Sequence, residues 1–349
     1  MNQHDDAGVE VSAERLRAGL EREGVPRVQR EFPNTPAGHE ALVRWLAAPG
    51  RTLRVVMEAT GLYGLDLALR LEAEPSVELM VANPRAVRHF ALALMKRSKN
   101  DPIDTEVLVE FAQRMPFHRW VRPSVSALTL HALARRLESL TEMHAAEKNR
   151  RHAAKLSPAL PAAVVHDLER SLRSLERAVN RLTRETVEVI AQDPDLKLRY
   201  QLLLSACGIG PTSAVQILAQ LAVLSGSLDV RQWVAQAGLD PRQYASGSSV
   251  HKKTCISKTG NRHLRRALYM PALVAIRHEP HLRAFYLHLV TRGKAKMQAL
   301  VAVMRKLLHA IFGMFKHQQP FDGTRLYRLP GDSPLPSPTV STAEALCTT

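Results

Sequence analysis

Residues 53–61 read LRVVMEATG, an apolar run that ends in a carboxylate, Glu58, and then a glycine. A short apolar run bounded by turn residues is typical of a strand that is buried on both faces of a sheet. Glu58 then stands at the carboxyl end of this strand, the edge where open α/β sheets bind ligands. A lone glutamate is also common there as a solvated or capping residue, so the position alone leaves both interpretations open.

The segments around this strand predict an α/β domain. Strand-like runs occur at residues 7–11, 28–32 and 77–81, and residues 35–47 have the composition and spacing of a helix. Strands that alternate with helices are typical of α/β folds. We therefore expect residues 1–118 to form one α/β domain.

The rest of the chain is expected to be mainly helical. Leucines at helical spacing predict two long amphipathic helices in residues 119–198, broken near Ser157-Pro158. These helices can pair as an antiparallel hairpin or form a coiled coil with a second chain, and the sequence does not choose between the two. A second, mostly helical domain is expected over residues 199–320, followed by a disordered tail rich in Pro, Ser and Thr at residues 321–349.

The chain carries a strong excess of positive charge. It has 48 Lys and Arg against 33 Asp and Glu, a formal net charge of +15. Residues 241–349 hold 17 Lys and Arg against 4 Asp and Glu, so +13 of this excess lies in the last third. A solvated basic surface would account for some of this charge, but the asymmetry favours a polyanionic partner, nucleic acid above all.

The cysteines and the hydropathy pattern predict a cytoplasmic protein. Cys207, Cys255 and Cys347 are isolated, with no CxxC pair and no histidine pair at zinc-finger spacing. No apolar run approaches the roughly 20 residues that span a bilayer, and the first residues are too polar for a signal peptide. We expect neither disulfides, structural zinc nor membrane contact.

Asp101-Pro102-Ile103-Asp104 begins a predicted helix that runs to about Met115. Two carboxylates three residues apart on a first helical turn share a face. Aspartate and proline are also what a helix start selects without any ligand, so a structural role accounts for them as well. The two roles are compatible, because a rigid pair of carboxylates also suits hard cations such as Mg²⁺.

Two segments of the predicted second domain are candidates for phosphate binding. Gly208-Ile209-Gly210 lies between apolar helical segments, as in helix-hairpin-helix turns whose backbone NH groups hold a phosphate, although an ordinary tight turn has the same pattern. Lys258 precedes a Gly-Asn turn, and a stripe on the following helix can face phosphates. That stripe contains three arginines, Arg262, Arg265 and Arg266.

A small, glycine-containing loop is expected at residues 244–249, followed by His251, Lys252 and Lys253. Composition alone makes a serine in such a loop a turn residue in most proteins.

Many ordered motifs make the chain resemble the DEDD transposases of insertion sequences known as the IS110 family, from about Gly8 to Lys316. The motifs that carry the resemblance are Glu31-Phe32-Pro33-Asn34-Thr35-Pro36-Ala37-Gly38, Met57-Glu58-Ala59-Thr60-Gly61-Leu62-Tyr63, Asn83-Pro84, Lys99-Asn100-Asp101-Pro102-Ile103-Asp104, Gly208-Ile209-Gly210-Pro211, Ala237-Gly238-Leu239-Asp240-Pro241-Arg242, Ser246-Gly247, Ile256-Ser257-Lys258-Thr259-Gly260-Asn261, Leu264-Arg265 and Arg305-Lys306-Leu307.

The resemblance implies an architecture and a set of site residues. It implies a RuvC-like domain of the ribonuclease H fold, a coiled-coil segment and a C-terminal transposase domain with a serine nucleophile. Glu58, Asp101 and Asp104 match the second, third and fourth carboxylates, and Ser246 matches the serine. Glu10 stands where the family carries its first aspartate, with an alanine in place of the lysine that follows in the family motif.

The expected function is therefore a recombinase that joins DNA strands, guided by an element-encoded structured RNA. The four carboxylates are expected to hold two Mg²⁺ ions, and a homodimer or homotetramer is expected because recombination needs two duplexes. A metal-dependent junction nuclease is the first alternative. The second is a catalytically degenerate transposase that only binds nucleic acid.

Overall fold

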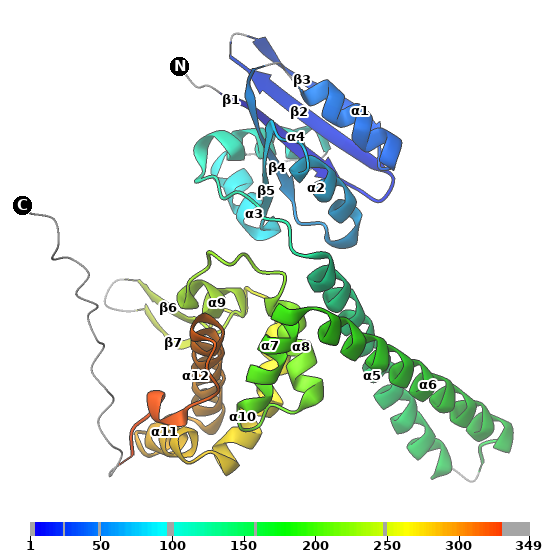
Figure 1. Ribbon diagram of the computed structural model, residues 1–349, viewed down its shortest axis with the longest axis vertical. Coiled ribbons are helices and arrows are strands. Elements are labelled where there is room, and N and C mark those ends of the chain that lie inside the picture. The colour runs from blue at the N-terminus through cyan, green and yellow to red at the C-terminus, as the bar shows by residue number, and fades with distance from the viewer. Residues whose placement is uncertain are drawn as a thin grey trace, which may run out of the picture. The chain divides into compact units, whose positions relative to one another are not determined.

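The computed structural model describes residues 4–23, 25–47, 50–95, 101–156, 159–246 and 250–329. The chain divides into two compact units, Met1–Arg122 and Pro123–Thr349, coloured from blue to cyan and from green to red in Figure 1. Each unit has its own hydrophobic core.

A five-stranded sheet forms the centre of unit 1, in the order β3-β2-β1-β4-β5. The first three strands form an antiparallel meander, and β4 and β5 run parallel to β1. The strands are β1 (His4–Val11), β2 (Arg15–Arg22), β3 (Val25–Pro33), β4 (Thr52–Glu58) and β5 (Val77–Ala82). The expected runs at 7–11, 28–32, 53–57 and 77–81 each lie within one of them, whereas β2 was not expected.

Helices cover both faces of this sheet (Figure 1). On one face, leucines of α1 and α2 pack against β1 and β4. On the other, α3 and α4 pack against β4 and β5 through Val87, Leu108 and Phe111. The helices are α1 (Pro36–Leu46), η1 (Gly61–Gly64), α2 (Leu65–Glu72), α3 (Pro84–Ala93) and α4 (Asp101–Arg114).

Two glycines let α4 lie directly on the sheet. A Cβ atom at Gly8 would come within 2.5 Å of the Cβ of Leu108, and one at Gly19 within 2.8 Å of the Cγ2 of Thr105. Because glycine has no Cβ, the helix can approach the backbones of β1 and β2 closely.

Unit 2 begins with two long helices, α5 (Val125–Lys155) and α6 (Ala162–Gln192), that pack along each other as a hairpin (Figure 1). Ser124 caps α5 by accepting a hydrogen bond from the Ala127 backbone NH at 3.1 Å. The described residues thus show the hairpin alternative within one chain.

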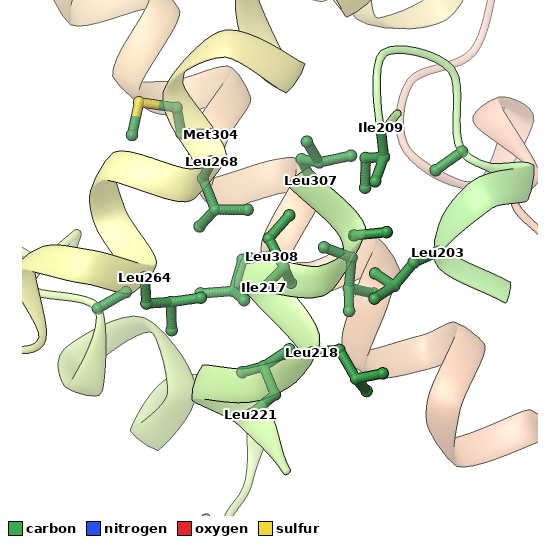
Figure 2. Close-up of a cluster of buried hydrophobic side chains, with 14 of the residues drawn as sticks. Leu203, Ile209, Ile217, Leu218, Leu221, Leu264, Leu268, Met304, Leu307 and Leu308 are labelled. Atoms are coloured by element: carbon green, nitrogen blue, oxygen red, sulfur yellow. The ribbon is translucent and has the colours of Figure 1, made fainter. Parts of the chain in front are cut away.

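The remaining helices of unit 2 surround one core (Figure 2). They are α7 (Pro194–Ser205), α8 (Pro211–Leu221), α9 (Val230–Gln236), α10 (Arg262–His278), α11 (Pro280–Thr291), α12 (Lys296–His317) and the short η2 (Gly323–Arg325). Figure 2 shows Ile217 and Leu218 of α8 meeting Leu264 of α10 and Leu308 of α12.

One helix is an exception to the expected absence of membrane-length apolar runs. Helix α12 is long and apolar enough, by length and composition, to cross a bilayer. Its apolarity has another cause, because Leu307, Leu308 and Ile311 are fully buried in the core of unit 2.

A β-hairpin interrupts the helices where the sequence predicted a loop at residues 244–249. Strand β6 (Pro241–Ser246) pairs antiparallel with β7 (Val250–Ile256), and Ser246 is opposite Val250 in the register. Ser246 is thus the last residue of a strand, whereas Gly247, Ser248 and Ser249 lie outside the described residues. The loop expectation was too long because Tyr, Val, Thr and Ile on both sides favour strands.

Candidate catalytic site and nucleic-acid interface

Glu10 and Glu58 lie side by side at the carboxyl ends of β1 and β4. The register of this parallel pair places Val9 opposite Met57, and the next residue on each strand is a glutamate. Adjacent strands are about 4.8 Å apart, so two like charges stand next to each other. Like charges on neighbouring strands oppose folding by a few tenths to about 1 kcal/mol.

Both glutamates belong to the face of the sheet that α4 covers. Val9 and Met57 are buried in the core under α1 and α2, and side chains alternate along a strand. Glu10 and Glu58 therefore point to the opposite face, the one on which Gly8 meets Leu108 of α4. One carboxylate oxygen of Glu10, Oε2, is buried.

The first turn of α4 lies over β2 and β3 on this same face. The Nε2 of Gln29 donates a hydrogen bond to the Pro102 carbonyl at 3.0 Å, and Thr105 contacts Gly19. Asp104, which is partly buried, belongs to this turn, and Asp101 is the first residue of the helix. The Gln29 and Gly19 positions are two residues along the strands from the level of Glu10, about 7 Å.

The backbones of β1, β4 and α4 thus bring the four predicted residues to one face of the sheet. Among the described side chains, which do not include that of Asp101, no group of three acidic, His or Cys residues is close enough to share one ion. Their donor atoms are all carboxylate oxygens, which fit a hard divalent cation.

An ion pair that the sequence did not predict lies beside these carboxylates. Arg17 is opposite Glu10 in the register and pairs with Glu31 of β3. The Nε of Arg17 is buried and has no hydrogen-bond partner among the described residues. Arg17, Glu10 and Glu31 come together only because β2 pairs with β1 and β3. Since the sequence did not predict β2, it could not predict this ion pair.

Asn34 ties the two segments that follow the glutamates. Its Nδ2 donates to the carbonyl of Ser12, after β1, at 2.8 Å and to that of Tyr63, after β4, at 3.0 Å. The Oδ1 of Asn34 lies 2.8 Å from the Nε2 of His39, whose pKa is lowered by burial. This network fixes the carboxyl edge of the sheet.

At the amino end of the same strands the carboxylates are neutralised within the chain. The buried Asp6 accepts hydrogen bonds from the Nε and Nη2 of Arg54 at 3.0 and 2.9 Å. The equally buried Asp5 pairs with Arg22 at 3.0 Å and Arg51 at 2.7 Å. These aspartates are committed to arginines, and they lie about 13 Å (Asp6) and about 17 Å (Asp5) along β1 from Glu10.

In unit 2 the three predicted arginines of α10 have different surroundings. The Nη1 of Arg265 donates to the Ala237 carbonyl at 2.8 Å and so holds the end of α9. Arg266 is 60% exposed and forms ion pairs with two glutamates of α5, Glu138 and Glu142. Arg262 is also exposed, so Arg262 and Arg266 are the two that reach solvent.

The β-hairpin and α12 border a groove of about 670 Å³ with a basic rim. Its lining includes Ile256, Met297 and Val301, and the cations of Lys258, Lys294 and Arg305. The side chains of Ser246, Lys252 and Lys253 lie outside the described residues, so their approach to this groove stays a prediction.

The predicted phosphate-binding turn joins α7 to α8. Gly208 has φ +93°, and a Cβ there would lie 2.5 Å from the Pro271 carbonyl of α10, so only glycine fits. Gly210 is exposed, precedes the first residue of α8 and has open space around it. Phosphate binding by this turn stays a prediction.

Two family profiles match the chain. A transposase profile of the DEDD, IS110 type matches residues 8–157, and the profile described as "Transposase IS116/IS110/IS902 family" matches residues 200–287. Together these segments exceed half of the chain.

Named relatives extend the similarity. The chain is 28% identical to the pilin gene-inverting proteins of Moraxella lacunata and Moraxella bovis, over 83% of this chain and 89% of each relative. It is also 28% identical to the transposase for insertion sequence element IS1328 of Yersinia enterocolitica, over 56% of this chain and 64% of that protein.

Proposed function

Because the chain belongs to the IS110 family of insertion-sequence transposases, we propose that it cuts and rejoins DNA strands with a carboxylate site in unit 1 and a serine in unit 2. An element-encoded structured RNA guides it to its targets in the cytoplasm. It acts as a homodimer or homotetramer, since recombination brings two duplexes together.

The proposed fold of unit 1 is ribonuclease H-like, of the RuvC type. The strand order β3-β2-β1-β4-β5, with only β2 antiparallel to its neighbours, supports this assignment. So does α4, which carries acidic residues across the face that holds Glu10 and Glu58.

The observation that carries the proposal is the like-charged pair Glu10 and Glu58 in register on β1 and β4. DEDD transposases are generally divalent-metal dependent. We assign Glu10, Glu58, Asp101 and Asp104 as the groups that would hold two Mg²⁺ ions. Bound there, the ions would supply positive charge next to a scissile phosphate. Glu10 and Glu58 belong to paired strands and Asp101 and Asp104 to one helix, and such rigid elements would limit reorganisation during the reaction.

Ser246 is the proposed nucleophile. Its Oγ would form a bond to the scissile phosphorus while the bond from phosphorus to the leaving DNA oxygen breaks, and the hydroxyl proton passes to a nearby base. His251, Lys252 and Lys253 follow on β7 and are candidates for that assistance. The covalent link preserves the phosphodiester energy needed to rejoin strands.

Rejoining distinguishes this proposal from a nuclease. The relatives in Moraxella are named for inverting a pilin gene, which supports strand exchange by this chain as well. The basic residues Lys258, Arg262 and Arg266, with the groove rim, are proposed to hold the DNA and RNA strands.

The experiment that tests the serine uses a matched pair of variants. Ser246→Ala should keep nucleic-acid binding and lose both recombination and a denaturant-resistant protein–DNA adduct. Ser257→Ala is the control, because the Oγ of Ser257 donates to Asp240 and serves the fold. An adduct formed by Ser246→Ala, or cleavage by the wild type that never passes through an adduct, would replace this mechanism with hydrolysis by activated water.

A further inference from the structure

Helix α6 carries a row of arginines on its outer face. They follow one another at steps of three and four residues, and at 100° per residue they fall within a sector of about 80° over about 21 Å of helix. We call this row the arginine stripe; its members are Arg170, Arg173, Arg177, Arg181 and Arg184.

The stripe faces away from α5. All five arginines are exposed, whereas Leu172 is buried and Leu168, Leu175 and Val179 are partly buried. These apolar residues repeat at steps of four and three, which forms the seam against α5. The arginines occupy the opposite side of the helix and contribute nothing to that seam.

Between Arg170 and Arg184 the acidic residues of α6 lie beside the stripe, and Glu188 follows on its sector one turn beyond Arg184. Glu169 pairs with Lys155 and Glu176 with His144, both residues of α5. On the stripe's own sector no carboxylate occurs from Arg170 to Arg184. Among the residues that the structure describes, none of the five arginines forms an ion pair.

We propose that the arginine stripe binds the phosphate backbone of a nucleic-acid duplex. Five like charges held within about 21 Å repel one another, and a polyanion removes that repulsion. Duplex DNA carries one charge per about 1.7 Å of axis, so a segment of that length presents about 12 phosphates. Guanidinium groups bind phosphate oxygens in a fork geometry.

A second copy of the hairpin is a poorer partner. The carboxylates of α5 that a neighbour would offer are Glu138, Glu142 and Glu147, and each already pairs with a cation of its own chain. The stripe is also distinct from the basic residues of the C-terminal helices, so it adds a second backbone contact outside the proposed catalytic machinery.

The test replaces all five arginines of the stripe with glutamine in the full chain. Glutamine keeps the helix, since its helix propensity is close to that of arginine. Binding is measured without divalent ions, so the carboxylate site does not enter. Because each phosphate contact contributes about 0.9 to the slope of log K against log salt, the slope should fall by up to about 4.5. The control, Arg136→Gln/Lys148→Gln/Arg150→Gln, removes exposed charges that form no row and should change the slope by less than about 1.

Two probes separate the sources of the duplex. A reduced slope with double-stranded DNA, with a hairpin RNA, or with both supports the proposal and identifies the partner. A slope equal to that of the wild type or of the control with both probes overturns it. A change of mass in light scattering with unchanged slopes also overturns it, because the stripe would then meet a second copy. Adduct formation by Ser246 is scored separately, so failure of either proposal is distinguishable.

Discussion

Strands β1 and β4 carry neighbouring charged residues at both ends of one face. The neighbours have opposite charges at the amino end and like charges at the carboxyl end. Four residues before the Glu10 and Glu58 level, the register pairs Asp6 with Arg54, and two nitrogens of the partly buried Arg54 donate to Oδ1 of Asp6. At the carboxyl edge two glutamates occupy the equivalent neighbouring positions. Both pairs lie on the same two strands and on the same face, which α4 covers.

The two ends differ in whether β4 places an arginine or a glutamate next to the acidic residue of β1. The Asp6–Arg54 pair is complete within the chain, and Arg54 also donates to the Ala112 carbonyl at the end of α4 at 2.6 Å. The carboxylates of Glu10 and Glu58 neighbour each other and gather acidic oxygens near the start of α4. These are the oxygens that we propose to hold a divalent cation at a rigid sheet edge.

The largest expected effect follows from removing one charge at the carboxyl edge. Glu58→Gln keeps the shape but removes an ion ligand, so strand cleavage with Mg²⁺ should fall by about a hundredfold or more. The free energy of unfolding should stay equal or rise by up to about 0.5 kcal/mol, because the like-charge repulsion disappears. Cleavage assays and urea unfolding measure the two. Normal cleavage by Glu58→Gln would contradict the proposed difference between the two ends.

Asp101→Asn and Asp104→Asn should reduce cleavage in the same way as Glu58→Gln. Each should lower the free energy of unfolding by at most about 1 kcal/mol, through the loss of a helix-start carboxylate.

The opposite end should give the opposite result. Asp6→Asn leaves the partly buried Arg54 without its anion and should cost about 3 kcal/mol of unfolding free energy. Cleavage per folded molecule should not change. An Asp6→Leu/Arg54→Met double variant removes both charges and should recover most of the loss. An Asp6→Asn protein that is stable but inactive would move the ion site to this end.

The length of Glu10 gives a smaller, sharper test. Glu10→Asp restores the shorter ligand of the family pattern, so cleavage should rise or stay equal, whereas Glu10→Ala should lower it. Single-turnover rates with Mg²⁺ measure the difference. Unaffected cleavage by Glu10→Ala would show that β1 contributes no ligand.

The smallest effect concerns the network at the carboxyl edge. Burial lowers the pKa of His39 below its ordinary value, so the unfolded chain binds a proton more readily than the folded one. Stability from this residue is therefore present above about pH 6.5 and is lost as the pH falls below it. The melting temperature should drop from pH 7 to 5, and the drop should be smaller in His39→Gln. Identical drops would exclude His39 from this edge.

Much of unit 1 could be predicted because several of its strands are short apolar runs in the sequence. The run at 53–57 is apolar except for Arg54, and the segments at 7–11 and 77–81 are likewise mostly apolar. Strand β2 (Arg15–Arg22) could not be predicted, since its Arg, Leu, Ala and Glu residues also suit a helix and it has no β-branched or aromatic residue. Its strand state comes from pairing on both sides with β1 and β3, which is tertiary information.

The site was predicted unevenly for the same reason. The place of Glu58 at a sheet edge could be predicted from its strand alone, because the apolar run that precedes it ends there. Asp101 and Asp104 are indistinguishable from helix-start residues until α4 is placed on the sheet. Glu10 and Ser246 rest on the family resemblance, and Arg17 beside Glu10 required the register of β2.

Gly8 and Gly19 have no side chain, so together they set how closely α4 lies on the sheet. The distance from the aspartates on the helix to the glutamates on the strands therefore depends on the absence of a Cβ atom at positions 8 and 19. An alanine at position 8 would lift the whole helix and widen that distance without touching any acidic residue. The side-chain length at position 10 and the height of α4 above position 8 both change this distance, so a change in one can compensate for a change in the other. A glutamate in place of aspartate at position 10 is one such change. In evolutionary terms the two positions should drift together, each constraining which residue the other tolerates.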